Sequence, residues 1–295
     1  MAVLTFLPQL ISSGLAVGSL YALVALGFSV IFAATRVINF AQGELVLAGA
    51  LAAYTLHVLW GLPMPVAFGA AALAGALLGL LTERLAVAPF RQMAGSHAWI
   101  MSTLGLGLLR RSFAQRVWGT SALALPSPFG TGRLEVAGVS LLQQEVATAA
   151  VAFALMFLLE WMFLKTILGR ALRAVAYHLD AARLMGIPPV AMYLFAFALS
   201  GALSGIAGFL ISPITGINAD MGIPLAIKGF AAATLGGRGV FRGALIGGLV
   251  LGVAETLAGG LLWAGFHDIF AFLVLLAALL VRPQGIFARA LPVRV

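Results

Sequence analysis

Residues 169–188 read GRALRAVAYHLDAARLMGIP, and this short stretch decides how the rest of the chain is organised. It is a polar, basic island between two long apolar runs, Val146–Leu164 and Val190–Ile211. Each run is long and apolar enough to cross a bilayer. Charged residues between two spans lie outside the lipid, and the arginines place this segment on the cytoplasmic side. A short ordered helix held there is typical of a surface offered to a soluble partner.

The composition is that of an integral membrane protein. Of the 295 residues, 62% are hydrophobic and only 9% are charged, whereas soluble domains carry about 25% charged residues. The net charge of +8 does not indicate nucleic-acid binding, because the basic residues are scattered between apolar runs and form no stripe. Cysteine is absent and the four histidines are dispersed, so the sequence predicts no disulfide and no metal site.

Outward from residues 169–188, the sequence predicts an all-α polytopic bundle of about eight or nine membrane segments. One of them, Pro224–Leu235, is too short to cross alone and predicts a half-helix or broken helix. The whole chain, 1–295, is expected to form a single transmembrane domain. The other predicted spans are Leu10–Ala33, Ile38–Trp60, Met64–Leu81, Ala98–Val117, Val146–Leu164, Val190–Ile211, Ala244–Trp263 and Ile269–Val281.

The distribution of basic residues predicts the orientation, because the larger set belongs in the cytoplasm. The N-terminus is then outside, the C-terminus is cytoplasmic, residues 166–189 form a cytoplasmic loop and residues 118–145 form an extracytoplasmic loop. The larger set is Arg36, Arg84, Arg91, Lys165, Arg170, Arg173, Arg183, Arg238, Arg242, Arg282, Arg289 and Arg294. The smaller set is Arg110, Arg111, Arg116 and Arg133, and Lys228 falls inside the short segment.

Glycines spaced by four residues predict close contacts between helices. Small residues at this spacing let helix backbones approach one another in lipid, which indicates a compact bundle of many helices. The pairs are Gly14/Gly18, Gly75/Gly79, Gly201/Gly205, Gly243/Gly247 and Gly248/Gly252.

Polar residues open the second predicted span. Asn39 and Gln42 stand at the expected helix start, where Asn39 either caps the helix or lines a polar path. A carboxylate suits the positive end of the helix dipole. Glu44 is deeper, and carboxylates inside a membrane usually face a bundle interior. These three residues are therefore candidates for lining a translocation path.

Two charges in the C-terminal half are expected to be partners. Lys228 lies in the short segment and Glu255 in the following span, and a structural ion pair is favoured over contact with a solute. Thr234 completes the candidate path residues. Glu160, near the cytoplasmic end of its span, is expected to pair with Lys165 or to extend to water.

The sequence argues against an enzyme, and no catalytic residues are assigned. The glycine-rich turn LGGRGVFRG at 235–243 lacks the Gly-Lys-Ser/Thr ending that cradles a nucleotide phosphate, and neither lysine of the chain is in such a setting. Ser204 and His267 could suggest an intramembrane hydrolase. No glycine stands two residues before Ser204, however, and serine is common on glycine-rich packing helices.

Several blocks in the same order give the chain a family resemblance. They are GSLYALVALG (18–27), INFAQGE (38–44), GRALRA (169–174), ARLMGI (182–187), KGFAAATLGG (228–237), GALIGG (243–248) and RPQGIF (282–287). The chain resembles LivH-type permeases, the membrane subunits of ATP-binding-cassette importers for branched-chain amino acids. One departure is Gln42, where the family often has histidine; glutamine keeps a polar group there.

The resemblance implies partners in a bacterial plasma (inner) membrane. These are a second, related permease subunit, two ATPase subunits that hold ATP and Mg, and an extracytoplasmic solute-binding protein. This chain is then expected to bind no cofactor of its own. The resemblance also implies that the cytoplasmic segment is the coupling loop that docks into the ATPase. Its expected coupling residues are Tyr177, His178, Leu179, Asp180, Ala182, Arg183, Leu184, Met185 and Gly186.

The solute is less closely defined than the class of protein. Relatives of this type also carry urea, short amides and aromatic acids, and most selectivity rests with the binding protein. A path rich in small residues and poor in charge suits a small zwitterion or a neutral solute. The rival class is a self-sufficient channel or secondary carrier, which needs a relay of intramembrane charges; only Glu44, Lys228 and Glu255 qualify.

Overall fold

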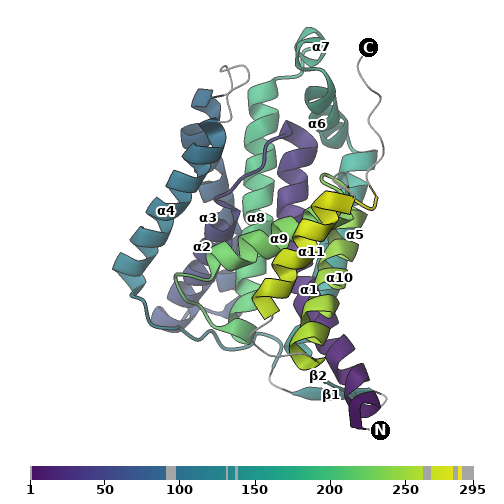
Figure 1. The fold of residues 1–295 in the computed structure, drawn as a ribbon. Coiled ribbons are helices and arrows are strands. Elements are labelled where there is room, and N and C mark those ends of the chain that lie inside the picture. Colours follow the sequence, from purple (N-terminus) through teal and green to yellow (C-terminus); the bar gives the residue numbers. More distant parts are fainter. Residues whose placement is uncertain are drawn as a thin grey trace.

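The computed structural model describes residues 2–90, 98–130, 132–136, 139–261, 267–281 and 285–287, and they form a helical bundle (Figure 1). The helices are α1 (Ala2–Thr35), α2 (Gln42–Tyr54), α3 (Met64–Thr82), α4 (Ala98–Trp118), α5 (Gln143–Lys165), α6 (Ile167–Tyr177), α7 (Leu179–Leu184), α8 (Pro189–Thr215), α9 (Gly222–Gly236), α10 (Phe241–Leu261) and α11 (His267–Val281). The π-helical turns Thr55–Leu59 and Glu83–Val87 extend α2 and α3, and a 3-10 turn follows at Ala88–Phe90. Two short strands, β1 (Arg133–Val136) and β2 (Val139–Leu142), form an antiparallel hairpin.

The fold confirms an all-α, multi-pass membrane protein. Among the described residues, six helical stretches are long and apolar enough to cross a membrane: Leu7–Thr35, Gln42–Leu59, Met64–Phe90, Gln143–Lys165, Pro189–Thr215 and Phe241–Leu261. The predicted short segment is α9, with 15 residues. The helix α4 is long enough but less apolar, because it carries Arg110, Arg111 and Arg116. The described part of α11 has 15 residues.

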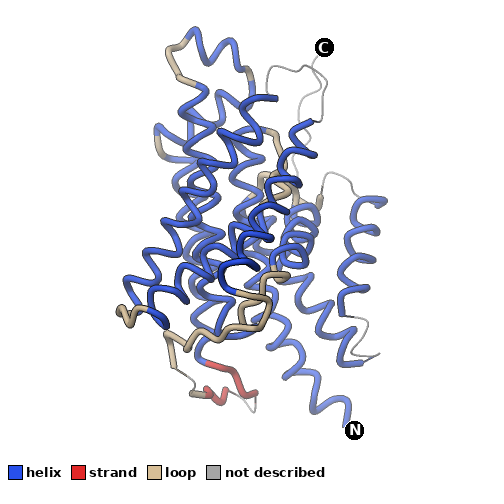
Figure 2. Tube along the Cα trace, turned by 90° about the vertical axis from the view of Figure 1, so that its left-hand side faces the viewer, coloured by secondary structure: helices blue, strands red, loops and turns tan. Residues whose placement is uncertain are grey.

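Two elements outside these stretches mark opposite ends of the bundle. The helices α6 and α7 project from one end, and the hairpin lies at the other (Figures 1 and 2). The sequence predicted a loop at 118–145 without secondary structure, and the structure shows that this region contains the hairpin. The side-chain amide of Gln9 donates to the Ser140 carbonyl (2.9 Å) and accepts from the Ser140 N–H (3.0 Å), which ties the hairpin to the start of α1.

The helix α2 begins inside the bundle and not at its end. Residues 36–41 are not helical, and they run back into the bundle from the end of α1 (Figure 1). Gln42 then hydrogen-bonds to Ser200 and Ser204, which lie in the middle of α8. The span predicted from Ile38 therefore becomes helical only at Gln42, because the side-chain oxygen of Asn39 (Oδ1) accepts from the Ala41 N–H (3.0 Å) in a local turn that competes with helix.

The helix α9 begins at the same depth from the other side. Residues 216–221 lead back from the end of α8, and α9 starts at Gly222. The backbones of Gly43 and Gly222 are in contact, and a Cβ added to Gly43 would meet the Gly222 carbonyl. Both helix N-termini therefore meet part-way through the bundle, with α9 lying across it (Figure 1).

The two irregular segments belong to an internal repeat. Residues 38–43 read INFAQG and residues 217–222 read INADMG. Asn39 and Asn218 each accept a hydrogen bond from the backbone N–H two residues on, at 3.0 and 2.8 Å. At the same distance from each Ile-Asn pair, α2 reads AAYTL (52–56) and α9 reads AAATL (231–235). The signal was present in the sequence, but it is confined to a few positions.

Helix packing follows the same repeat. The most extensive helix pairs are α1 with α10 and α3 with α8, while α2 lies on α8 and α9 lies on α1. The units α1–α2–α3 and α8–α9–α10 are therefore equivalent, and they run in opposite directions through the bundle (Figure 1). Inverted repeats with broken helices recur in membrane transport proteins.

The glycine spacing predicted from the sequence is confirmed at both large helix pairs. In α1 and α10, Gly18 and Gly252 face each other, and in α3 and α8, Gly75 and Gly201 do so. A Cβ at any of these positions would meet a neighbouring backbone atom. The backbone cannot shift away as a flexible side chain could, so the repeat depends on small residues at these crossings.

We predict that Gly201→Ala destabilises the protein. The added methyl group would press on the Gly75 carbonyl oxygen, and overpacking of this kind costs about 1–3 kcal/mol. The matched control is Gly69→Ala in α3, where nothing lies within 4 Å of the new methyl group and alanine is the better helix former. The midpoint of thermal unfolding in detergent should fall for Gly201→Ala and stay level or rise for Gly69→Ala. Equal midpoints would contradict the packing account.

Candidate translocation and coupling sites

A cluster of buried amides and hydroxyls fastens the start of α2. Asn39 donates to Gln42 (3.2 Å), and the Gln42 amide donates to Ser200 (2.9 Å) and Ser204 (2.6 Å). Ser200 in turn donates to the Gly27 carbonyl (2.8 Å). The four side chains are fully buried. In this conformation Asn39 and Gln42 hold α2 against α8 and α1; a role in lining a path stays a prediction.

Glu44 lies where the two helix N-termini meet. Its side chain is buried, and its carboxylate oxygens face Gly107 of α4 and Gly222 of α9, positions where a Cβ would lie 3.2 Å from them. The positive end of α9 suits a carboxylate there. Arg110 and Arg111 lie within electrostatic range. Glu44 is therefore a buried charge between three helices, as the sequence predicted from its depth.

The arginines beside Glu44 are in the body of α4, whereas sequence reasoning assigned them only to one aqueous side. Arg110 donates to the Leu78 carbonyl of α3 (2.8 Å), and its second terminal nitrogen is buried with no hydrogen-bond partner among the described residues. Arg111 pairs with Asp220, just before α9 (Nε to Oδ1, 2.8 Å). Two adjacent arginines inside an otherwise apolar helix were the signal that could have identified them.

The predicted pairing of Lys228 with Glu255 is confirmed. Their side chains meet at 2.6 Å, and the exposed fractions are 13% and 0%. The Lys228 ammonium also donates to the Tyr21 hydroxyl (3.2 Å) and lies 5.3 Å from the centroid of that ring. Sequence reasoning missed Tyr21. The three residues join α9, α10 and α1.

The remaining residues singled out from the sequence are Thr234, Ser204, His267 and Glu160. Thr234 is buried in α9, and its hydroxyl has no hydrogen-bond partner in the described part of the chain. Ser204 belongs to the buried amide cluster, and the side chain of His267 lies outside the described residues. Glu160 pairs with Arg242 (2.7 Å), and not with Lys165 as expected, because α10 presents Arg242 to it across the helix interface.

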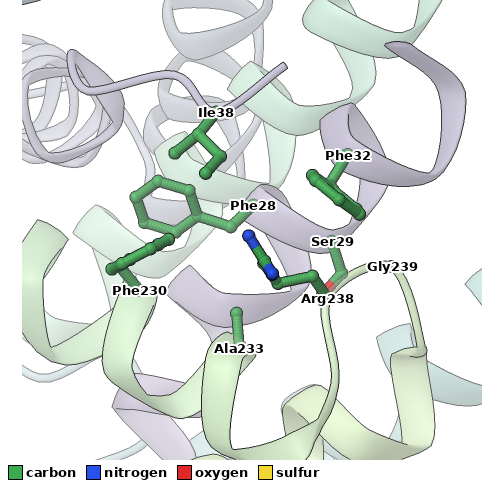
Figure 3. A pocket seen from close by; sticks show the side chains of 8 residues that line it. All are labelled: Phe28, Ser29, Phe32, Ile38, Phe230, Ala233, Arg238 and Gly239. Atoms are coloured by element: carbon green, nitrogen blue, oxygen red, sulfur yellow. The ribbon is translucent and has the colours of Figure 1, made fainter. Parts of the chain in front are cut away.

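A small cavity lies beside the first irregular segment. It has a volume of about 10 Å³, roughly the space of one water molecule, and Figure 3 shows its aromatic side chains around the guanidinium of Arg238. Arg238 and Arg36 each lie 5.4 Å from the centroid of Phe32. We refer to it as the Arg238 pocket; its lining residues are Phe28, Ser29, Phe32, Ile38, Phe230, Ala233, Arg238 and Gly239.

A second cavity of about 10 Å³ lies beside the other irregular segment. Its wall includes Trp118, whose indole N–H donates to Thr55 (2.9 Å), and the backbone bridge between Leu123 and Ile217. We refer to it as the Trp118 pocket; its lining residues are Leu51, Ala114, Trp118, Gly119, Ser121, Leu123, Ile217, Asn218 and Ala219.

The expected coupling residues form one ordered element at the end opposite the hairpin. The short helix α7 is capped at both ends, which explains why six residues hold a helix. His178 Nδ1 accepts from the Ala181 N–H (3.2 Å). At the other end the Gly186 N–H bonds to the Arg183 carbonyl and the Ile187 N–H to the Ala182 carbonyl, with Gly186 at φ +77°. This is a Schellman ending, which needs glycine at that position.

The surface of this element is suited to docking. Leu184 and Met185 are 89% and 81% exposed, and Tyr177 is also exposed. Asp180 and Arg183 pair on the exposed side at 3.4 Å. Behind them, Gly169, Leu172 and Val175 of α6 and Ala182 of α7 are buried. Exposed apolar residues on a polar, rigid element indicate a protein-binding surface.

An apolar bundle with inverted repeats, broken helices and buried charge pairs is the architecture of a membrane transport protein. The chain belongs to the family described as "Branched-chain amino acid transport system / permease component", whose model matches residues 10–279.

Individual relatives align over nearly their full length. The high-affinity branched-chain amino acid transport system permease protein LivH of Salmonella typhimurium is 32% identical over 97% of this chain and 96% of that protein. The corresponding protein BraD of Pseudomonas aeruginosa is 34% identical over 96% of both chains. A probable branched-chain amino acid transport permease LivH of Methanocaldococcus jannaschii is 32% identical over 91% of this chain and 88% of that protein.

We predict that the Lys228–Glu255 pair is structural. Removing one charge leaves the other without its ion-pair partner in a site of low dielectric constant, and breaking a buried pair in this way typically costs about 3–5 kcal/mol. Lys228→Met and Glu255→Gln should therefore each reduce the amount of folded protein recovered from membranes, and the double variant should recover part of the loss. Purely additive losses would argue against the pairing. If each single variant folds fully but loses transport, the pair belongs to the solute path instead.

Proposed function

We propose that this chain is the membrane-spanning permease subunit of an ATP-binding-cassette importer, and that it carries branched-chain, hydrophobic amino acids. Family membership supports the permease role, and the relatives' names support the solute class. ATP and Mg are bound and hydrolysed on separate subunits, and this chain acts without a cofactor. The lack of a Gly-Lys-Ser/Thr sequence agrees with this division of labour.

The observation that carries the proposal is the α6–α7 element. A doubly capped helix with Leu184 and Met185 at its exposed tip is built to be held by another protein. Residues 166–189 are in this proposal the coupling loop. When the ATPase subunits close, they push α7, and the buried face of α6 (Gly169, Leu172 and Val175) passes the movement to the bundle.

The complete importer needs further partners. A second, related permease subunit lies beside this chain in the plasma (inner) membrane, each permease rests on an ATPase subunit, and a solute-binding protein delivers the solute from outside. Whether the two permeases are identical is decided by which chain copurifies.

The proposed orientation follows from the arginine distribution and the two ends of the bundle. The α6–α7 end faces the cytoplasm together with the C-terminus, and the hairpin end faces outward with the N-terminus and residues 118–145. In this proposal the membrane segments are the six long apolar stretches together with α4, α11 and the short α9, nine in all. The whole of 1–295 is then one transmembrane domain.

Alternative solutes keep the same architecture. Urea, short amides and aromatic acids would use the same importer type, since its selectivity rests largely with the binding protein. A self-sufficient carrier is disfavoured by the side-chain contacts. Lys228 and Glu255 bond to each other and Glu44 lies beside other helices, so the described charges form no relay through the bundle.

We predict that substitutions that change the charge or polarity at the tip of α7 uncouple ATP hydrolysis from transport. Arg183→Glu and Leu184→Asp both alter exposed residues, so the protein should insert normally. Loss of a docking contact worth more than about 1.4 kcal/mol should lower uptake by the complex at least about tenfold. The measurement is ATP-dependent uptake of radiolabelled leucine together with stimulated ATP hydrolysis.

The matched control for the charge reversal is Arg133→Glu, an exposed arginine at the hairpin end. It should leave both activities at wild-type levels. Wild-type uptake and stimulated hydrolysis in the α7 variants would show that the docking assignment is wrong. Failure of the wild-type chain to copurify with any ATPase would refute the importer proposal itself.

Two single-cysteine variants test the proposed orientation, and the chain has no cysteine of its own. Ala122→Cys lies in the loop at the hairpin end and Ala181→Cys lies on α7, and both positions are exposed. In intact cells an impermeant thiol reagent should label the first and not the second. Permeabilised cells, in which both cysteines should react, serve as the control. The reverse pattern in intact cells would overturn the orientation.

A further inference from the structure

The two cavities are related by the internal repeat. The Arg238 pocket contains Ile38, and the Trp118 pocket contains Ile217, the equivalent residue of the other half. Phe230 and Leu51 line the same two pockets and occupy equivalent positions on α9 and α2. Each irregular segment, 36–41 or 216–221, thus leads in from one end of the bundle past an equivalent pocket to the common meeting point of the two helices.

The first segment is anchored in the interior. Asn39 and Gln42 belong to the fully buried amide cluster, with hydrogen bonds to Ser200 and Ser204. Withdrawing this segment would leave several buried donors and acceptors unpaired, which is strongly unfavourable in a low-dielectric site. The segment 36–41 is therefore a fixed point of the bundle.

The second segment has its charged anchor at the surface, while its Ile217 side chain is fully buried. Asp220 is 63% exposed, and it accepts from Arg111 (2.8 Å) and Gln115 (3.2 Å) of α4. Ile217 exchanges two backbone hydrogen bonds with Leu123, both at 2.8 Å. Exposed ion pairs contribute little to stability, and water can replace these partners when they separate. The polar anchors of segment 216–221 can therefore be released more readily than the buried amide anchors of its counterpart.

The sequence difference between the two halves explains this asymmetry. Where the first half has Ala41 and Gln42, the second has Asp220 and Met221. The first pair provides an amide for the interior, and the second provides a carboxylate for the surface. The repeat has kept the Asn turn and the glycine in both halves while changing how each segment is held.

We propose that residues 216–221 are the extracytoplasmic gate of this permease, latched shut here by the Asp220–Arg111 pair and the Leu123–Ile217 bridge, while residues 36–41 are its fixed pivot. Release of the latch would open the Trp118 pocket towards Gly222 and Glu44, the buried charge next to it. The inference rests on the proposed function, because it assigns the outer side to the hairpin end.

The latch can be locked with a disulfide. Leu123 and Ile217 form a hydrogen-bonded antiparallel pair, for which the Cα separation is about 5.5 Å, within the range for a disulfide. The variant Leu123→Cys/Ile217→Cys introduces the only cysteines of the chain. In the assembled complex, oxidation should reduce ATP-dependent leucine uptake at least about tenfold, because a latched gate admits no solute, and a reducing agent should restore it.

The matched control is Glu135→Cys/Ser140→Cys, a pair that faces across the hairpin without touching residues 216–221. Its oxidation should leave uptake unchanged. A fully cross-linked Leu123→Cys/Ile217→Cys complex that transports at the wild-type rate would overturn the gate while leaving the importer proposal intact. If the wild-type complex shows no ATP-dependent leucine uptake, the result would instead count against the importer proposal.

A second measurement tests the gate without transport. Ala219→Cys and Val37→Cys place one thiol in each irregular segment. Between the nucleotide-free complex and the complex trapped with a non-hydrolysable ATP analogue, the labelling rate at Ala219→Cys should change at least about fivefold, and that at Val37→Cys less than about twofold. Equal changes, or a larger change at Val37→Cys, would overturn the assignment of gate and pivot.

Discussion

The close approach of the Gly43 and Gly222 backbones is the constraint on which the rest of the structure depends. It allows two helices of opposite direction to begin at the same depth, which in turn requires six irregular residues before each one. Those residues are tolerated inside an apolar bundle because their polar groups are satisfied locally or lie in protein. The contact also brings Glu44 against the positive end of α9.

Charge inside the bundle is sparse and locally compensated. Lys228 and Glu255 neutralise each other, and Glu44 lies near Arg110. Among the residues that the structure describes, these charges form no continuous chain along which an ion gradient could drive transport. In the proposed importer the energy enters from outside the membrane, through α6–α7. Few charges have to change partners when the two halves move, which suits rigid-body rocking.

The general architecture could be predicted from the sequence, since hydropathy, glycine spacing and the Lys228–Glu255 pair depend on composition and local pattern. The start of α2 could not, because apolar Ile38 and Phe40 continue the hydropathy of the span while the Asn39 turn ends the helix. The inverted repeat was not recognised from the sequence, because few residues are identical between the two halves. Arg242 as the partner of Glu160 depends on the crossing of α5 and α10, which no sequence pattern specifies.

The most direct test of this account is a double-mutant cycle at the crossing of α2 and α9. Gly43→Ala should lower the thermal unfolding midpoint in detergent, because its Cβ would overlap the Gly222 carbonyl, and Gly222→Ala, whose Cβ would lie 3.1 Å from the Gly43 carbonyl, should lower it less. The double variant should lose little more than the worse single one, since the first methyl group already separates the helices. Strictly additive losses, or single variants as stable as the wild type, would contradict the account.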